Sequence, residues 1–284
     1  MEKREIIKEN YPESLQEIPK TPEKLFVIGE IPEAEIYLGI VGTRKNSHYG
    51  KEVTEKIIEE LSSLLGDQIV TVSGLAYGID TIVHKASIKN NIRTIAIPGS
   101  GLDKKVLYPK ENHNLADEII KNGGALISEF TWDYPASTYT FPQRNRIIAG
   151  LSRGVLVIEA PEKSGALITA NFALDFNREV FAVPGPIFSE NSKGTNKLIK
   201  EGAIPVTCGK DILEAWGIDF EEEKGEILLE GMEKEIWEIL SEPTEKDLII
   251  QKIGRPTSEI SSAVALMEIK GLIKSSGGKI YRNH

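Results

Sequence analysis

The sequence has a single cysteine, Cys208, which excludes an internal disulfide and a cysteine-cluster metal site. No apolar run approaches the roughly 20 residues of a membrane-spanning helix. The N-terminal stretch MEKREIIKEN alternates charges where a secretory signal would be apolar. No complete G-x-G-x-x-G or Walker A sequence is present, so a dinucleotide or ATP site is not favoured. These absences predict a cytoplasmic protein with no membrane partner, no metal and no bound cofactor.

The net charge is −9, which on its own argues against a nucleic-acid partner. The acidity is concentrated, however, because residues 1–37 carry 5 basic and 9 acidic side chains and residues 217–231 carry 1 and 6. The stretch 38–216 has 20 of each sign, and 232–284 has 8 of each. A neutral domain can still contain a basic cleft, since the local field steers a polyanion. The composition therefore permits binding of DNA without predicting it.

From residue 36 onward, short β-branched runs alternate with longer amphipathic ones. Strands are expected at 36–42, 69–74, 94–101, 125–130, 154–160 and 179–185, and helices near 49–65, 78–89, 110–122, 142–151, 165–177 and 194–201. The strands are nearly all apolar, as in parallel strands that are buried on both faces. Repeated strand–helix units predict an α/β fold with an open, doubly wound, mostly parallel sheet.

The segment 217–231 contains a dense acidic run between two glycines, and we interpret it as a linker. Residues 232–284 then predict three helices and a terminal hairpin about Gly277-Gly278, the order of a winged helix. We expect Thr244 and Asp247 to form a capping box before the second helix. Ser258 is the expected cap of the third.

The third helix of this predicted winged helix has no Arg or Lys before Lys270. Arginine and lysine are the usual donors to base edges in a major groove. We therefore expect the small domain to mediate protein contacts or weak duplex binding.

In an open parallel sheet, ligands bind beyond the carboxyl ends of the strands. Five of the expected strands end in glycine or small hydroxyl residues, whose backbone N–H groups can bind an anion. The candidates are Gly42, Thr43, Arg44, Ser73, Gly74, Gly78, Gly99, Ser164 and Gly165, with Gly185 after the sixth strand. Together they predict a phosphate-bearing ligand. For each glycine the alternative is tight-turn geometry alone.

Arg44 follows the first strand directly, where a guanidinium could contact phosphate in bidentate fashion. The alternative is a surface salt bridge.

The run from Phe141 to Ile148 is a second unusual cluster, with Pro142 suited to the first turn of a helix. Arg144, Asn145 and Arg146 could bind phosphates, while Phe141 or Tyr139 stacks on a base. Arg146 could instead be buried in an ion pair with a strand-end carboxylate such as Glu159.

Residues suited to catalysis are scarce. Asp80 and His84 are spaced to pair along one helix face, either as an acid–base pair or as a structural hydrogen bond. Lys110, together with Lys104 and Lys105, is interpreted as a source of positive charge near the cleft. Cys208 is assigned no role.

Long motifs in a fixed order and spacing then identify a family. The DNA-processing protein DprA (Smf) family is what these motifs resemble: VGTRKNSHYG, SGLAYGIDTIVHKASI, AIPGSGLDKKVLYPKEN, SEFTWDYPASTYTFPQRNRIIAGLSRGVLVIEA, SGALITANFAL, VFAVPG and SKGTNKLIKEGA. The resemblance runs from Tyr11-Pro12 to Trp216. It indicates a core at 11–216 preceded by a short extension at 1–10.

The resemblance implies an extended Rossmann-like fold that binds single-stranded DNA in a basic pocket at the strand ends. It also implies homodimerisation, protection of incoming strands, loading of the RecA recombinase during natural transformation, and no enzymatic activity. The matching pocket positions are Arg44, Ser73, Gly74, Gly78, Gly99, Lys110, Phe141, Arg144, Asn145 and Arg146.

Many relatives have a basic residue where this chain has Thr138, so either affinity is lower here or other lysines compensate.

Two other functions remain open. The glycine-rich strand ends also resemble LOG-type nucleotide hydrolases, with Asp80 or Glu159 as general acid or base, although the PGGxGT signature is absent. A transcriptional regulator, with the core as sensor and the winged helix as DNA reader, is the third possibility.

Overall fold

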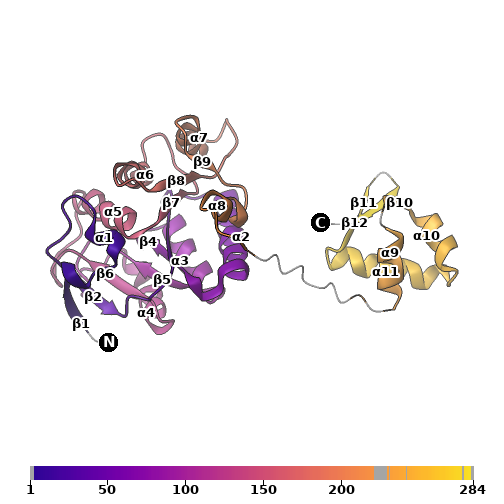
Figure 1. The fold of residues 1–284 in the computed structure, drawn as a ribbon, viewed down its shortest axis with the longest axis horizontal. Coiled ribbons are helices and arrows are strands. Elements are labelled where there is room, and N and C mark those ends of the chain that lie inside the picture. Colours follow the sequence, from indigo (N-terminus) through magenta and orange to yellow (C-terminus); the bar gives the residue numbers. More distant parts are fainter. Residues whose placement is uncertain (1–2, 221–228, 230, 241, 277, 283–284) are drawn as a thin grey trace. The chain divides into compact units, whose positions relative to one another are not determined.

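The computed structural model describes residues 3–220, 229, 231–240, 242–276 and 278–282. The chain divides into two compact units, Met1–Glu221 and Glu222–His284 (Figure 1). This division falls within the segment 217–231 that the sequence predicts as a linker, and residues 221–228 and 230 of that segment lie outside the described residues. None of the described helices is long and apolar enough to cross a membrane.

The larger unit is built on a nine-stranded sheet with the order β1-β2-β6-β5-β4-β3-β7-β8-β9. The strands are β1 (Lys3–Ile7), β2 (Lys24–Gly29), β3 (Ile36–Val41), β4 (Ile69–Ser73), β5 (Arg93–Ala96), β6 (Ala125–Ser128), β7 (Gly154–Val157), β8 (Glu179–Ala182) and β9 (Ile204–Pro205). From β3 to β9, the strands pair in parallel. The segment β5-β4-β3-β7-β8-β9 has the strand order of a Rossmann fold, and its direction of winding reverses between β3 and β7. The predicted α/β, doubly wound, mostly parallel fold is confirmed.

Residues 3–7 belong to the sheet, although the sequence analysis treated 1–10 as an extension. Strand β1 pairs antiparallel with β2, and β2 pairs antiparallel with β6. These two strands extend the sheet beyond the parallel part. Neither strand was expected from the sequence, where the first predicted strand begins at residue 36.

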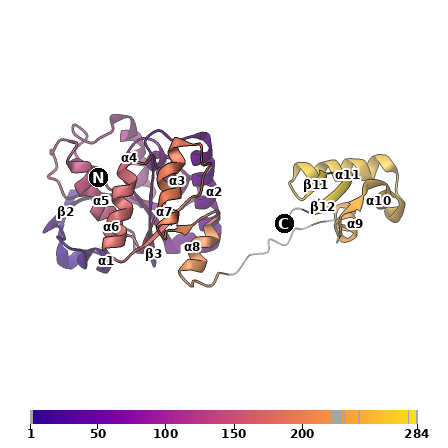
Figure 2. The same cartoon turned by 90° about the horizontal axis from the view of Figure 1, so that it is seen from above.

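Helices cover both faces of the sheet (Figures 1 and 2). They are α1 (Glu13–Gln16), α2 (His48–Leu65), α3 (Ile79–Lys89), α4 (His113–Lys121), α5 (Thr140–Leu151), α6 (Gly165–Asp175), α7 (Lys193–Lys200) and α8 (Gly209–Ala215). The apolar side chains of α2, α3 and α8 share one buried cluster, and those of α1, α5, α6 and α7 share another. Strands β3 and β7 lie between these two layers of helices. The loops that follow the two strands lie side by side at the carboxyl edge of the sheet.

The smaller unit has its own buried core, formed by Ile236, Leu240, Ile249, Ile260, Val264, Met267, Ile273 and Ile280. Its elements are α9 (Met232–Ile239), β10 (Thr244–Glu245), α10 (Lys246–Ile253), α11 (Thr257–Ile269), β11 (Ile273–Ser276) and β12 (Lys279–Arg282). The three strands form an antiparallel sheet in the order β10-β12-β11. The assignment to the winged-helix class stays a prediction.

Both helix caps predicted for this unit are wrong. Thr244 lies in β10, and its hydroxyl donates to the carbonyls of Ile239 and Glu242 instead of capping α10. Helix α11 begins at Thr257 with Pro256 as its N-cap, so Ser258 lies inside the helix. Of the predicted hairpin turn, Gly278 has a positive φ of 78° and Gly277 lies outside the described residues.

Candidate functional site

A cavity of about 340 Å³ lies at the carboxyl ends of β3 and β7, where the strand order reverses. Helices α5 and α6 form its other walls. Its lining includes eight of the predicted site residues: Gly42, Thr43, Arg44, Phe141, Arg144, Asn145, Ser164 and Gly165. Ser73, Gly74, Gly78, Gly99, Lys110 and Arg146 do not line it. A cavity is therefore present at the edge of the sheet where an open parallel sheet is expected to bind its ligand.

Arg44 and Phe141 meet at the mouth of this cavity. The guanidinium carbon of exposed Arg44 lies 4.7 Å from the centre of the Phe141 ring, within the range of a cation–π contact. Gly99 makes this ring position possible, since a Cβ at residue 99 would lie 2.6 Å from Cδ1 of Phe141. Gly99 thus contributes by allowing close approach, and it does not line the cavity.

Two tyrosines extend the aromatic surface away from the cavity. The Tyr108 ring lies edge-on to Phe141 with centroids 5.8 Å apart, and Tyr77 lies edge-on to Tyr108 at 6.1 Å. The Tyr77 hydroxyl donates to Glu111, and this bond raises the pKa of Tyr77 to about 12. Neither tyrosine is among the predicted site residues, although Tyr108 lies two positions before Lys110, which is one of them.

Arg144 is buried and donates hydrogen bonds to two backbone carbonyls and to one side chain. Its Nη1 donates to the carbonyls of Gly74 and Ile97, and its Nε donates to Oδ1 of Asn145. Burial lowers its pKa to about 10, with the charge of Asp80 opposing that shift. The guanidinium therefore joins the ends of β4 and β5 to helix α5.

Asn145 and Arg146 also hold elements together. The Nδ2 of Asn145 donates to the carbonyl of Gly165 at 3.1 Å and so fixes α5 to the start of α6. Arg146 forms an ion pair with Glu129 at the end of β6. Arg146 therefore forms the ion pair with a strand-end carboxylate that was the alternative prediction. The suggested partner, Glu159, is wrong, because the carboxylate belongs to Glu129.

Several predicted residues shape the loops beneath the cavity. The Ser73 hydroxyl is buried and donates to the Ile40 carbonyl at 2.7 Å. Gly78 has a φ of +76°, and a Cβ there would collide with the Thr43 carbonyl. Ser164 caps α6 by accepting from the Ala166 N–H, while the space beside Gly165 is open. Lys110 is exposed outside the cavity.

Lys45 and Lys163 are two cations that the sequence analysis missed. Both are exposed, both line the cavity, and neither forms an ion pair with any residue that the structure describes. Their positions next to Arg44 and Ser164 in the sequence could have revealed them. With Arg44 they place three cationic side chains around one opening.

Among the described residues, Asp80 and His84 form no hydrogen bond with each other, so they are neither the acid–base pair nor the structural hydrogen bond that their spacing suggested. The Nδ1 of His84 bonds to the Thr94 hydroxyl at 2.8 Å, and burial lowers the His84 pKa to about 3. Asp80 accepts from the Ala76 N–H, and burial raises its pKa against the opposing charges of Arg144 and Arg44. His84 is thus a neutral, buried side chain that does not line the cavity, whereas Asp80 does.

Glu159 occupies the N-terminus of α2, where a Rossmann fold commonly binds a phosphate. Its carboxylate accepts from the Ser47 N–H at 2.9 Å and from the Ser47 hydroxyl at 2.6 Å. A Cβ on Gly50 would collide with that carboxylate. The protein's own anion therefore fills this position, and Glu159 does not line the cavity.

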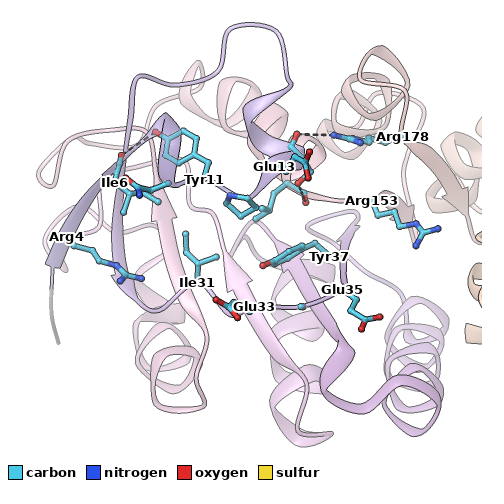
Figure 3. A pocket seen from close by; sticks show the side chains of 15 residues that line it. Arg4, Ile6, Tyr11, Glu13, Ile31, Glu33, Glu35, Tyr37, Arg153 and Arg178 are labelled. Atoms are coloured by element: carbon cyan, nitrogen blue, oxygen red, sulfur yellow. Dashed lines mark hydrogen bonds between the residues drawn. The ribbon is translucent and has the colours of Figure 1, made fainter.

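A second, larger cavity of about 820 Å³ opens at the opposite edge of the sheet (Figure 3). Its walls carry charges of both signs, from Arg4, Arg153 and Arg178 and from Glu13, Glu33 and Glu35. Arg178 donates to the Ser14 carbonyl at 3.0 Å, and Arg153 donates to the Trp216 carbonyl at 3.3 Å. This hollow lies where β3, β7 and β8 begin, away from the predicted site.

The described residues contain no cluster of His, Cys, Asp or Glu able to hold a metal ion.

The extended sheet, with a cation-lined cavity at its point of reversal, defines a Rossmann-like ligand-binding protein. The chain belongs to the family of the DNA recombination-mediator protein A, which matches residues 4–217. The resemblance inferred from the motifs is confirmed.

Named relatives cover most of the chain. Protein Smf of Escherichia coli is 38% identical over 96% of this chain and 75% of its own length. The DNA processing protein DprA of Streptococcus pneumoniae is 44% identical over 73% of this chain and 72% of its own.

Two solved structures share the fold. The S. pneumoniae DprA structure has a TM-score of 0.67 at 40% identity and covers 77% of this chain and 74% of that one. The Helicobacter pylori DprA structure, described as showing a unique single-stranded DNA binding mode, also has a TM-score of 0.67, at 28% identity, and covers 77% and 97%.

Proposed function

We propose that this protein binds single-stranded DNA, without sequence preference, at the cavity between α5 and α6. The observation that carries the proposal is the contact of Arg44 with Phe141 beside Lys45 and Lys163. A groove with cations that track the backbone and an aromatic ring that stacks on bases is the usual arrangement for single strands. The description of the H. pylori relative as a single-stranded DNA binder supports the same assignment.

Each group has a distinct role in this proposal. Arg44, as the principal anchor, contacts a phosphate, and Lys45 and Lys163 add charge on either side of the opening. Phe141 is the stacking platform. Because Arg44 already covers that ring, a base stacks there only when the guanidinium turns toward a phosphate. The space beside Gly165 is open, so in this proposal a phosphate approaches the N-terminus of α6 there.

Lys45 and Lys163 also bear on Thr138, the position where many relatives have a basic residue. Thr138 is exposed, and it does not line the cavity. In our proposal the two lysines supply the charge that many relatives place at that position.

The wider role follows from the family. We propose that the protein protects incoming single strands in the cytoplasm and helps to load RecA during natural transformation and recombination, acting as a homodimer. The family's description as a recombination mediator supports this role. We further propose that it acts by binding alone, because the carboxylates of Glu159 and Asp80 both accept internal hydrogen bonds.

Fluorescence-anisotropy titration with a labelled oligothymidylate, repeated with duplex at several salt concentrations, tests the proposal. We expect a preference for the single strand and a steep loss of affinity with salt. Equal affinity for both forms at low salt would contradict it. A parallel screen for base release from nucleoside monophosphates should give no product, and product formation would favour a LOG-type hydrolase.

A further inference from the structure

The loop after β8 exposes two large apolar side chains at the tip of a turn. The Ser189 N–H donates to the Pro186 carbonyl at 3.0 Å, so Ile187 and Phe188 are the two central residues. Ile187 is 76% exposed and Phe188 is 93% exposed. Gly, Asn, Asp and Ser usually occupy such positions, because they suit turn geometry and water. An apolar pair here contributes nothing to the core and therefore needs another explanation.

The loop that contains this turn is hydrogen-bonded to a residue that lines the cavity. The Nδ2 of Asn191 donates to the carbonyl of Lys45 at 2.9 Å, and the Asn191 carbonyl accepts from the Ala160 N–H at 2.7 Å. On the other side of the loop, the Tyr49 hydroxyl donates to the Pro184 carbonyl at 2.8 Å. The loop is thus fixed beside a residue that lines the cavity, at the same carboxyl edge of the sheet.

The residues around the turn indicate which kind of partner contacts Phe188. A protein partner would be expected to meet a continuous apolar patch. Here the neighbours along the chain include the Glu190–Lys193 ion pair, and the loop adjoins Lys45, which has no ion pair within the described residues. An exposed aromatic ring in a loop that is hydrogen-bonded to the backbone of Lys45, an uncompensated cation, is suited to a base and its neighbouring phosphate.

We propose that Phe188 is a second stacking platform for single-stranded DNA, contacted by the part of the strand that leaves the cavity on the β8 side. Lys45 contacts the phosphates between the two platforms, Phe141 and Phe188. This inference rests on the proposed function and extends its footprint along the edge of the sheet.

The test compares short and long oligonucleotides on Phe188→Ala. Oligothymidylates of about 5 nucleotides fill the cavity alone, whereas those of about 20 also reach the turn. We expect Phe188→Ala to weaken binding of the longer strand by roughly tenfold, as for the loss of one stacked base, and to leave the shorter one unchanged. Phe188→Trp should keep the affinity, and its added fluorescence should be quenched by the longer strand only.

Leu174→Ala is the matched control, since Leu174 is an exposed apolar residue at the far end of α6. Light scattering of each variant separates a loss of self-association from a loss of DNA contact. Equal affinity of Phe188→Ala and wild type for the longer strand would overturn the inference, as would a loss explained by dissociation of the protein alone. Failure of wild type to bind either strand would instead overturn the proposed function.

Discussion

The guanidinium carbon of Arg44 lies 4.7 Å from the centre of the Phe141 ring, although the two residues are far apart in the sequence. Arg44 follows β3, and Phe141 lies in the first turn of α5. Burial on the two faces of the sheet holds these elements in place, so the contact is set by the fold as a whole. A cation and a stacking surface thus share one site, and their contributions to binding can be separated by experiment.

Replacing Arg44 with alanine should weaken binding to all single-stranded sequences alike, because phosphate contacts carry no base information. The slope of log affinity against log salt should flatten by about 0.7, the share of one phosphate on a single strand. Anisotropy titrations at several salt concentrations measure this slope. Arg44→Lys is the control, since it keeps the charge and should keep the slope. An unchanged slope in Arg44→Ala would remove this residue from the proposed site.

Phe141→Ala should weaken binding by about 1 to 3 kcal/mol, the range for one stacked base, and leave the salt slope unchanged. Gly99→Ala should produce a similar loss, because its Cβ would occupy the space of the Phe141 ring. Since both changes act through the same ring, the double variant should be no weaker than Phe141→Ala alone. Additive losses would show that Gly99 contacts the strand independently.

Arg146→Met should lower the stability of the core by about 3 kcal/mol, because it leaves the largely buried Glu129 carboxylate without its partner. Adding Glu129→Gln should recover part of that loss. Affinity for single-stranded DNA should change little in the double variant. Urea unfolding and anisotropy measure the two effects separately. A large loss of affinity in a variant of near-normal stability would return Arg146 to the binding site.

The isolated smaller unit should show no specific or tight binding to duplex DNA. It has a separate buried core, and helix α11 has no Arg or Lys among its residues Thr257–Ile269. Electrophoretic mobility shifts of a fragment spanning residues 229–284, with random and mixed duplexes, check this. Tight, sequence-dependent shifts would support the regulator alternative instead.

The parallel part of the fold could be predicted from the sequence because its strands carry strong apolar runs. Strand β1 could not, since its sequence KREII is largely charged and lies at the edge of the sheet, where one antiparallel neighbour suffices. The cap predicted at Thr244 failed for a different reason. The tertiary structure pairs Thr244 with Ile280 in a sheet, which overrides the local capping pattern.

The site was predicted as a set of residues but not as a geometry. The sequence pattern could place Arg44 and Phe141 at the same edge of the sheet. It could not show that Arg144 is buried and donates to backbone carbonyls, while Lys45 and Lys163 stay exposed. That distinction depends on which side chains the packing buries. Charge and motif alone do not carry this information.

His84 predicts a pH dependence of stability that is unrelated to DNA. Its pKa falls from an ordinary value of 6.5 to about 3, because burial disfavours the charged ring. The unfolded chain therefore binds a proton near pH 6.5 while the folded protein does not. The stability associated with the neutral ring is full above pH 6.5 and is lost progressively as the pH falls toward 3.

Between about pH 7 and about pH 4.5, this residue should cost about 2 to 3 kcal/mol of unfolding free energy. His84→Asn places an amide near the Thr94 hydroxyl that the ring contacts, but it does not titrate. Urea unfolding of both proteins at the two pH values should therefore show a smaller pH dependence in the variant, even though its stability at neutral pH is lower. Equal pH dependence would mean that His84 is not held neutral by burial, because the difference between the two proteins isolates this one ring from every other titrating group.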